Sequence, residues 1–254
     1  MSSGHVHALY LHGHSPLHRL APQVKILGAI TLVFCFVATP RSAFWAFGVY
    51  AAVLVSLTFV ARIPPSFALR RMAIEIPFLI LALLLPILGS GERVDVLGMS
   101  LSEAGMWDAW NILAKATLGL ATAVILGATT QIPEILSGLD GLKMPSVVTA
   151  IAGFMVRYID VIASDWSRMR VAMASRGHDP RWLAQIGPLA RTLGVMFIRT
   201  YERGERVYLA MRSRGYTGTM PASVIPATPP LQWVLMLALV IPMAVIATIA
   251  TVRV

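Results

Sequence analysis

Charged residues are scarce in this sequence. Only 13% of its 254 residues are charged and 57% are hydrophobic, with a mean hydropathy of +0.72. Soluble domains carry about 25% charged residues, so the composition excludes an ordinary soluble protein and predicts an integral membrane protein. Acidic residues are fewer than basic ones, 12 against 21. Lysine and arginine are enriched in the cytoplasmic loops of membrane proteins, next to acidic lipid headgroups, so the excess of positive charge indicates such loops.

Several kinds of site are missing as well. Cys35 is the only cysteine, which excludes a disulfide within the chain and a cysteine metal site. No glycine-rich loop ends in Gly-Lys-Ser/Thr, so no ATP-hydrolysing site is predicted, and the N-terminus lacks a signal-peptide pattern. Glu75 and Lys115 are too shallow and too few for an intramembrane enzyme. We therefore expect no catalytic residue, no cofactor and no metal ligand set in this chain.

What the sequence does contain is long apolar runs. An 18-residue helix spans about 27 Å, close to the hydrocarbon core of a bilayer. Residues 145–176 and 186–211 instead show amphipathic helical spacing, and the first of these runs looks too polar to cross. The predicted fold is an all-α integral membrane protein with about five transmembrane helices plus two long amphipathic cytoplasmic helices. The five predicted spans cover residues 22–39, 43–60, 72–88, 110–130 and 231–252.

Basic residues set the predicted orientation. Residues 131–230 hold Lys143 and eleven arginines, so 12 of the 21 basic residues, whereas loop 89–108 holds only Arg93. By the positive-inside rule, residues 131–230 and the N-terminus are cytoplasmic, loop 89–108 is outside, and Arg41 is the one exception. The expected organisation is a tail with four spans in 1–130, a cytoplasmic region in 131–230 and the last span in 231–254, within the cell (inner) membrane.

The sequence also predicts the local positions of several residues near the ends of the spans. Lys25 is expected to extend its ammonium group toward the membrane surface, and Glu75 to pair with Arg71 at the interface. Residues 93–96 and 99–101 are expected to form a small β-hairpin. Trp107 and Trp110 are expected to lie at the membrane interface.

A near-repeat connects the two amphipathic runs. Residues 172–177 read Ala-Met-Ala-Ser-Arg-Gly and residues 210–215 read Ala-Met-Arg-Ser-Arg-Gly, identical at five of six positions. Glycine after a helix is a common stop signal, and arginine suits the negative end of the helix dipole. One copy would be an ordinary helix end, but two matched copies predict that a partner recognises both. The candidate site residues are Ser175, Arg176, Gly177, Ser213, Arg214 and Gly215.

At these motifs the sequence resembles the transmembrane coupling subunit, or T component, of energy-coupling factor transporters, and the resemblance covers essentially the whole chain. That family carries two short Ala-Arg-Gly-type motifs at the ends of its coupling helices, and serine here replaces the alanine before each arginine. A second family pattern, Leu-His-Arg-Leu-Asp-Pro-Arg-x-Lys, is matched by residues 17–25, where Ala21 and Gln23 depart from the usual Asp and Arg.

The resemblance implies what the chain would do. Its partners would be two ABC-type ATPase subunits, each binding one arginine tip in a groove, and a separate substrate-capturing membrane subunit. Residues 15–19 and 175–178 look closest to cobalt-type T components. That type serves a metal-capturing subunit for cobalt ion transport that feeds cobalamin biosynthesis. Nickel is the near alternative as substrate and a vitamin the farther one.

Other classes of function remain open at this point. An ordinary ABC permease would form the pore itself and work as a symmetric pair. A histidine-tail metal-binding membrane protein would use the imidazoles, which suit cobalt, nickel and zinc, although the same segment also reads as a flexible solvated tail. Nucleic acid is not an expected partner, because no nucleic-acid-binding fold is recognisable. The tail histidines are His5, His7, His12, His14 and His18.

Overall fold

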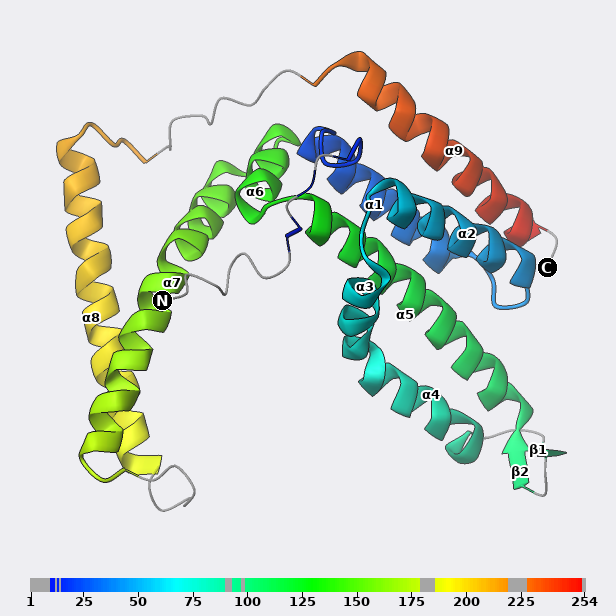
Figure 1. The fold of residues 1–254 in the computed structure, drawn as a ribbon, viewed down its shortest axis with the longest axis horizontal. Coiled ribbons are helices and arrows are strands. Elements are labelled where there is room, and N and C mark those ends of the chain that lie inside the picture. Colours follow the sequence, from blue (N-terminus) through cyan, green and yellow to red (C-terminus); the bar gives the residue numbers. More distant parts are fainter. Residues whose placement is uncertain are drawn as a thin grey trace. The chain divides into compact units, whose positions relative to one another are not determined.

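Helices form most of the residues that the computed structural model describes (Figure 1). The structure describes residues 10–11, 13, 15–89, 93–96, 99–178, 186–218 and 228–252. They divide into two units. The bundle unit holds the described residues of Leu9–Gly138 and Pro226–Val254, and the two-helix unit holds those of Leu139–Ile225.

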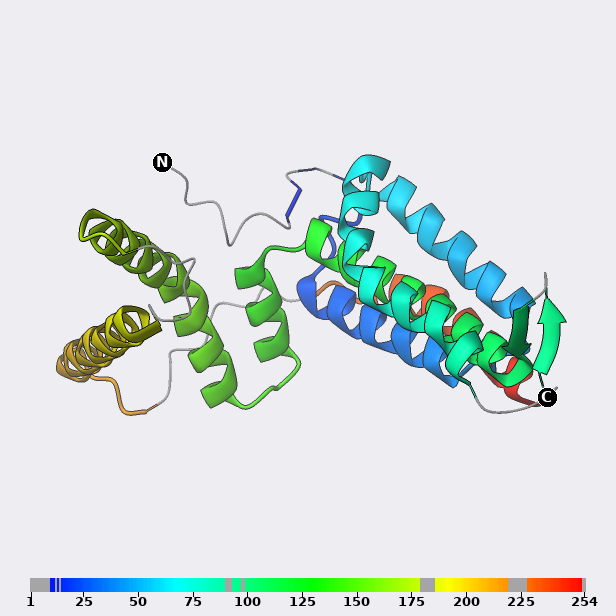
Figure 2. The same ribbon diagram turned by 90° about the horizontal axis from the view of Figure 1, so that it is seen from below.

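The bundle unit is built from apolar helices around α5. Proline opens several of them, where its missing N–H would have been unpaired anyway, and the Ser102 hydroxyl caps α5 by accepting a hydrogen bond from Gly105 N. α5 packs against α1, α2, α3 and α4, and α9 packs against α1 and α2 (Figures 1 and 2). The helices are α1 (Pro22–Ala38), α2 (Phe44–Val60), α3 (Pro65–Met72), η1 (Ala73–Glu75), α4 (Ile76–Leu88), α5 (Glu103–Thr129) and α9 (Pro230–Val252).

Close packing in the bundle has two clear centres. Tyr50 and Phe36 are almost fully buried, and the Tyr50 hydroxyl lies 3.0 Å from Thr39 Oγ1 and 3.4 Å from the Met243 carbonyl of α9. At the other centre, α4 and α5 approach so closely at Gly105 that a Cβ there would overlap the Leu85 carbonyl. Only glycine fits that crossing.

The predicted all-α membrane fold is confirmed, with different span boundaries. By length and composition, four helical segments could cross a membrane: Pro65–Leu88, Glu103–Thr129, Ser146–Ser175 and Pro230–Val252. α1 and α2, at 17 residues each, are shorter. The third span thus begins at Pro65 and the fourth at Glu103, both earlier than predicted. From its sequence the run 145–176 looks too polar to cross, but α7 is long and apolar enough to do so, because the stretch before Arg157 carries no charge.

The end of the bundle near the start of α5 carries the predicted hairpin and aromatic residues. β1 (Arg93–Val96) pairs antiparallel with β2 (Met99–Ser102), so the predicted hairpin is confirmed. The Phe44 ring lies 5.6 Å from Trp107 and 5.2 Å from Trp110. Arg41, the exception to the charge asymmetry, forms an ion pair of 2.7 Å with Asp108.

Two charged side chains are more deeply buried than their sequence positions suggest. Lys25 does not reach the surface: it is 9% exposed, and its Nζ donates to the carbonyls of His18 and Thr129. Glu75 is also 9% exposed and accepts a hydrogen bond from the Thr117 hydroxyl of α5, so it is buried in the bundle, and its pairing with Arg71 stays a prediction. In both cases a neighbouring helix supplies the partner, and sequence spacing cannot predict such a partner.

The two-helix unit contains α7 (Ser146–Ser175) and α8 (Ile186–Ser213). The short helix α6 (Ile132–Gly141) runs from the bundle unit into this unit. α7 and α8 contact one another, and large apolar side chains such as Met155 and Phe197 remain exposed on them. Each helix therefore has an apolar surface that the described residues leave uncovered.

Candidate functional site

The C-terminal end of α7 is closed by a pair of nested backbone hydrogen bonds. His178 N donates to the Met173 carbonyl at 3.1 Å, and Gly177 N donates to the Ala174 carbonyl at 3.0 Å. Gly177 has φ +78°, the left-handed conformation that glycine adopts without a Cβ penalty. Together these features are the Schellman motif, which satisfies carbonyls that a helix end would otherwise leave unpaired.

The C-terminal end of α8 repeats this geometry bond for bond. Tyr216 N donates to the Met211 carbonyl at 3.1 Å, and Gly215 N donates to the Arg212 carbonyl at 3.0 Å. Gly215 has φ +86°. The near-repeat in the sequence is therefore a repeat in three dimensions, because both bonds of the motif close within six consecutive residues.

The serine before each arginine has the same local partner in both copies. Ser175 Oγ donates to the Ala172 carbonyl at 3.0 Å, and Ser213 Oγ donates to the Ala210 carbonyl at 2.9 Å. Each hydroxyl is thus satisfied by its own helix. The two serines therefore contribute to the local hydrogen bonding of the helix ends.

Both arginines are accessible. Met173 and Met211 are half-buried behind the turns, whereas Arg176 and Arg214 are exposed. Within the described part of the chain, neither guanidinium has a hydrogen-bond or ion-pair partner. A Cβ built on Gly177 or Gly215 would meet nothing within 4 Å, so open space surrounds each turn. We refer to residues 174–177 and 212–215 as the two arginine tips.

Contacts between α7 and α8 put the two tips at opposite ends of an antiparallel pair (Figure 1). Near the end of α7, Met173 Sδ accepts a hydrogen bond of 3.2 Å from Thr192, near the start of α8. Further along, Asp165 pairs with Arg203. α8 has 28 residues, which corresponds to about 42 Å of helix. One chain thus presents two matched tips separated by roughly a helix length.

The carboxylate of Asp165 links α7 to α8 near the middle of the two helices. Asp165 Oδ2 lies 2.9 Å from Arg203 Nη2 of α8, and Asp165 Oδ1 accepts a hydrogen bond from Arg168 of its own helix. Asp165 thus accepts hydrogen bonds from arginines on both helices. The carboxylate therefore connects the middle of α7 to α8. The two residues lie on different helices, 38 positions apart in the sequence, so their spacing alone does not predict the pair.

The tips also differ in ways that the repeat conceals. Ala174 in the first corresponds to Arg212 in the second, and His178 corresponds to Tyr216. Tyr216 lines a cavity of about 410 Å³ between α7 and α8, whose other lining residues include Phe154 and Tyr208. The second tip is therefore more basic and is attached to an aromatic cavity.

The N-terminal motif fastens the start of α1 to α9. Ala21 N donates to Gln232 Oε1 at 2.7 Å, and Gln23 Oε1 accepts from the Thr228 hydroxyl at 3.1 Å. These are the two positions where the sequence departs from the pattern that it resembles. Ala21 and Gln23 are both neutral, so the hydrogen bonds at these two positions involve no charged side chain.

The histidine tail is described only at its end. His18 Nε2 donates to the Leu11 carbonyl at 3.0 Å, and His18 Nδ1 accepts from the Ser15 hydroxyl at 2.6 Å. Both ring nitrogens are thus engaged. Within the described ranges, no group of three His, Cys, Asp or Glu side chains could hold a metal ion. The other four histidines, His5, His7, His12 and His14, lie outside the described residues.

Comparison with known proteins identifies one family. The family model described as CbiQ, cobalt transport protein, matches residues 13–226. A putative fused cobalt transport protein CbiMQ of Methanocorpusculum labreanum is 24% identical over 81% of this chain, and an uncharacterized protein of Methanocaldococcus jannaschii is 26% identical over 67%. The chain spans only 36% and 61% of these two relatives' lengths. The energy-coupling factor transporter transmembrane protein EcfT of Thermotoga maritima is 25% identical over 84% of this chain and 81% of its own.

Proposed function

Because the chain belongs to the cobalt transport protein family CbiQ, we propose that it is the transmembrane coupling subunit of an energy-coupling factor transporter that imports cobalt ions. In this role it is a non-catalytic, multi-pass membrane subunit. Its partners are two ABC-type ATPase subunits and a metal-capturing membrane subunit. The observation that carries the coupling role is the pair of identically capped arginine tips at opposite ends of α7 and α8.

Each tip has the chemistry of a docking element. A guanidinium stays charged at all relevant pH values and can donate in a fork to carboxylates or carbonyls. A helix laid into a groove is a common mode of recognition. We therefore assign Arg176 to one ATPase subunit and Arg214 to the other, with Ser175, Gly177, Ser213 and Gly215 shaping the two turns.

The antiparallel pair offers a route for mechanical coupling. When the two ATPase subunits close on ATP, the sites that hold the tips change their separation. The Asp165–Arg203 ion pair and the Met173–Thr192 contact resist independent motion of the two helices. The displacement is then passed on as a rigid movement or a small shear of packed helices.

The competing classes are less well supported. A symmetric ABC permease needs one coupling segment per chain, whereas this chain carries two unequal tips. A histidine-tail metal-binding protein would need free imidazoles, and both ring nitrogens of His18 are bonded to protein groups. A subunit count in the purified complex distinguishes the permease, because the proposed role requires one copy of this chain per two ATPase subunits.

Cobalt is proposed as the ion because the family model and the fused relative both carry it in their descriptions. The likeness of residues 175–178 to cobalt-type T components adds to this. The metal itself would be held by the partner subunit and then used in cobalamin biosynthesis. Nickel is the second candidate, since both ions accept the same nitrogen ligands and are neighbours in the affinity order.

Ion uptake tests the assignment. Cells expressing the whole complex should accumulate radioactive cobalt, and deleting this chain should abolish that accumulation. Excess nickel should compete weakly. Uptake that is unchanged by the deletion would contradict the proposed function. Equal uptake of nickel would contradict only the choice of cobalt.

Residues 131–230 and the N-terminus are proposed to be cytoplasmic, and residues 89–108 to be outside. We expect a cysteine at exposed Glu103 to react with a membrane-impermeant thiol reagent in intact cells, and one at exposed Ser167 to react only after permeabilisation. Cys35 is buried and adds little background. The opposite labelling pattern would reverse the orientation.

A further inference from the structure

Two lysines connect α1 and α5 in a reciprocal way. Lys25, near the start of α1, donates to the carbonyl of Thr129 at 2.9 Å, and Thr129 is the last residue of α5. Lys115 of α5 donates to the carbonyl of Val37 at 2.9 Å, in the last turn of α1. Each helix thus supplies a lysine whose ammonium group caps the C-terminal end of the other helix. Hydrogen bonds therefore connect α1 and α5 at both ends of the pair.

Both bonds use the strongest acceptors that a helix offers. The last carbonyls of a helix lack partners within it and form the negative end of its dipole. Lys25 is 9% exposed and also donates to the His18 carbonyl at 3.3 Å. A buried ammonium without such partners is very costly, so α1 cannot easily turn away from the end of α5.

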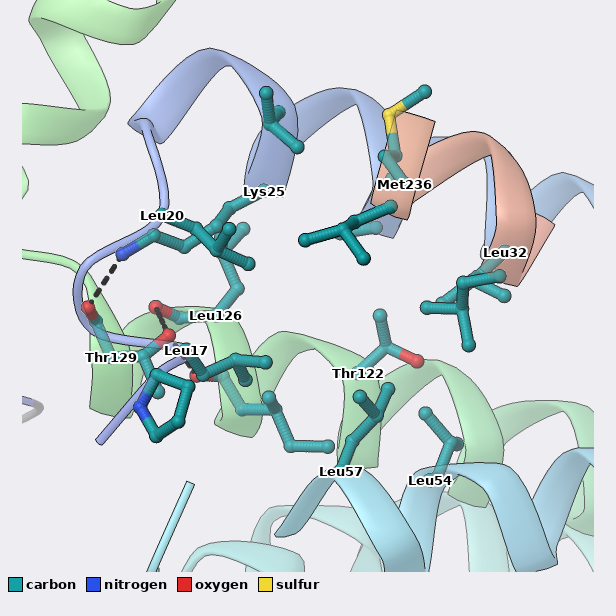
Figure 3. A pocket seen from close by; sticks show the side chains of 17 residues that line it. Leu17, Leu20, Lys25, Leu32, Leu54, Leu57, Thr122, Leu126, Thr129 and Met236 are labelled. Carbon is teal, nitrogen blue, oxygen red and sulfur yellow. Dashed lines mark hydrogen bonds between the residues drawn. The ribbon is translucent and has the colours of Figure 1, made fainter. Parts of the chain in front are cut away.

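The cavity beside Lys25 offers few polar groups. It measures about 340 Å³ and is lined mainly by apolar side chains from α1, α2, α5, α9 and the N-terminal segment (Figure 3). The hydroxyls of Thr122 and Thr129 face it, but each donates to a carbonyl of its own helix. An ammonium that left Thr129 would therefore move into an apolar space.

Lys25 lies where the chain leaves the bundle. After Thr129 the chain enters α6 at Ile132, and α6 leads on to α7. Gly138 of α6 packs so tightly on the start of α1 that a Cβ there would lie 2.9 Å from Pro22 and 2.8 Å from Ile26. Lys115 makes its bond at the far end of the same helix pair.

We propose that Lys25 is a positioning residue for the coupling step. It locks the end of α5 to α1, so that a displacement entering through α6 moves α1 and α5 together, and α9 with them through its packing on α1. Lys115 makes the same kind of bond but stabilises the pair without transmitting the motion. This inference rests on the proposed coupling role and not on the identity of the ion.

The experiment compares Lys25→Met with Lys115→Met in the complete complex in lipid bilayers. Both changes keep most of the aliphatic stem and remove the ammonium, and thermal unfolding measures the stability that each one loses. Spin labels at exposed Ile30 and Ala123, with Cys35→Ala, report the distance between the middle of α1 and the C-terminal part of α5. We expect one distance, unchanged by ATP, in the parent and in Lys115→Met. Lys25→Met should add a second, ATP-dependent distance.

Transport gives an independent measurement. Cobalt taken up per ATP hydrolysed should fall roughly tenfold in Lys25→Met, a factor that corresponds to about 1.4 kcal/mol, and recover largely in Lys25→Arg. An unchanged distance in Lys25→Met, or equal changes in both methionine variants, would overturn the inference. A parent complex without cobalt uptake would instead contradict the proposed ion, and the distance measurement would still decide the role of Lys25.

Discussion

Transport is expected to stop when Arg176 and Arg214 are both replaced by glutamate, and each single replacement should reduce it strongly. Both guanidinium groups are exposed on rigid, identically capped turns and have no partner within the described residues, so they are free to bind the ATPase subunits. Removing one partner of a buried charge pair costs about 2–5 kcal/mol, and reversing the charge adds repulsion. Co-purification of the ATPase subunits and ion uptake both measure the effect.

Arg191→Glu is the matched control for the tip variants. Arg191 is an exposed arginine on α8, but it lies near the start of that helix and outside either tip. The same charge change there should leave ATPase association and transport nearly unchanged. If both tip variants bind the ATPase subunits and transport normally, these arginines are not the docking groups. If Arg191→Glu is equally damaging, the effect comes from total charge and not from the tips.

Loss of the folded bundle is the second large effect, expected for Gly105→Ala. A Cβ at this position overlaps the Leu85 carbonyl and lies 3.0 Å from Pro86 Cα. These are backbone atoms of α4, so no side chain can move aside to make room. Overpacking a core costs about 1–3 kcal/mol, and a rigid backbone obstacle places this change at the upper end. A lower unfolding temperature and less monodisperse protein in detergent are expected.

Gly119→Ala provides the comparison within the same helix. A Cβ at Gly119 would meet nothing within 4 Å, so the added methyl group has space. Alanine is also the better helix former, by roughly 0.5–1 kcal/mol in the middle of a helix. The unfolding temperature should therefore stay the same or rise. Equal destabilisation by both substitutions would mean that α4 and α5 do not cross closely at Gly105.

Local features of this protein could be predicted from sequence. The apolar runs identified helices of a membrane protein, because burial in lipid demands both apolar side chains and internally bonded backbone. The near-repeat identified the two tips, since a Schellman turn is closed by bonds within six residues. The small hairpin was predictable for the same reason, because both of its strands are adjacent in the chain.

Long-range contacts were decided only by the tertiary structure. Lys25 and Glu75 looked like surface charges, yet each is buried against α5, because a side chain's depth depends on which helix packs beside it. The Asp165–Arg203 ion pair and the Met173–Thr192 hydrogen bond join two helices, and their order along the chain shows that the helices are antiparallel. The local sequence therefore determined how the C-terminal ends of α7 and α8 are capped. Packing determined that the two tips lie a helix length apart and that Lys25 secures the point where the bundle meets α6.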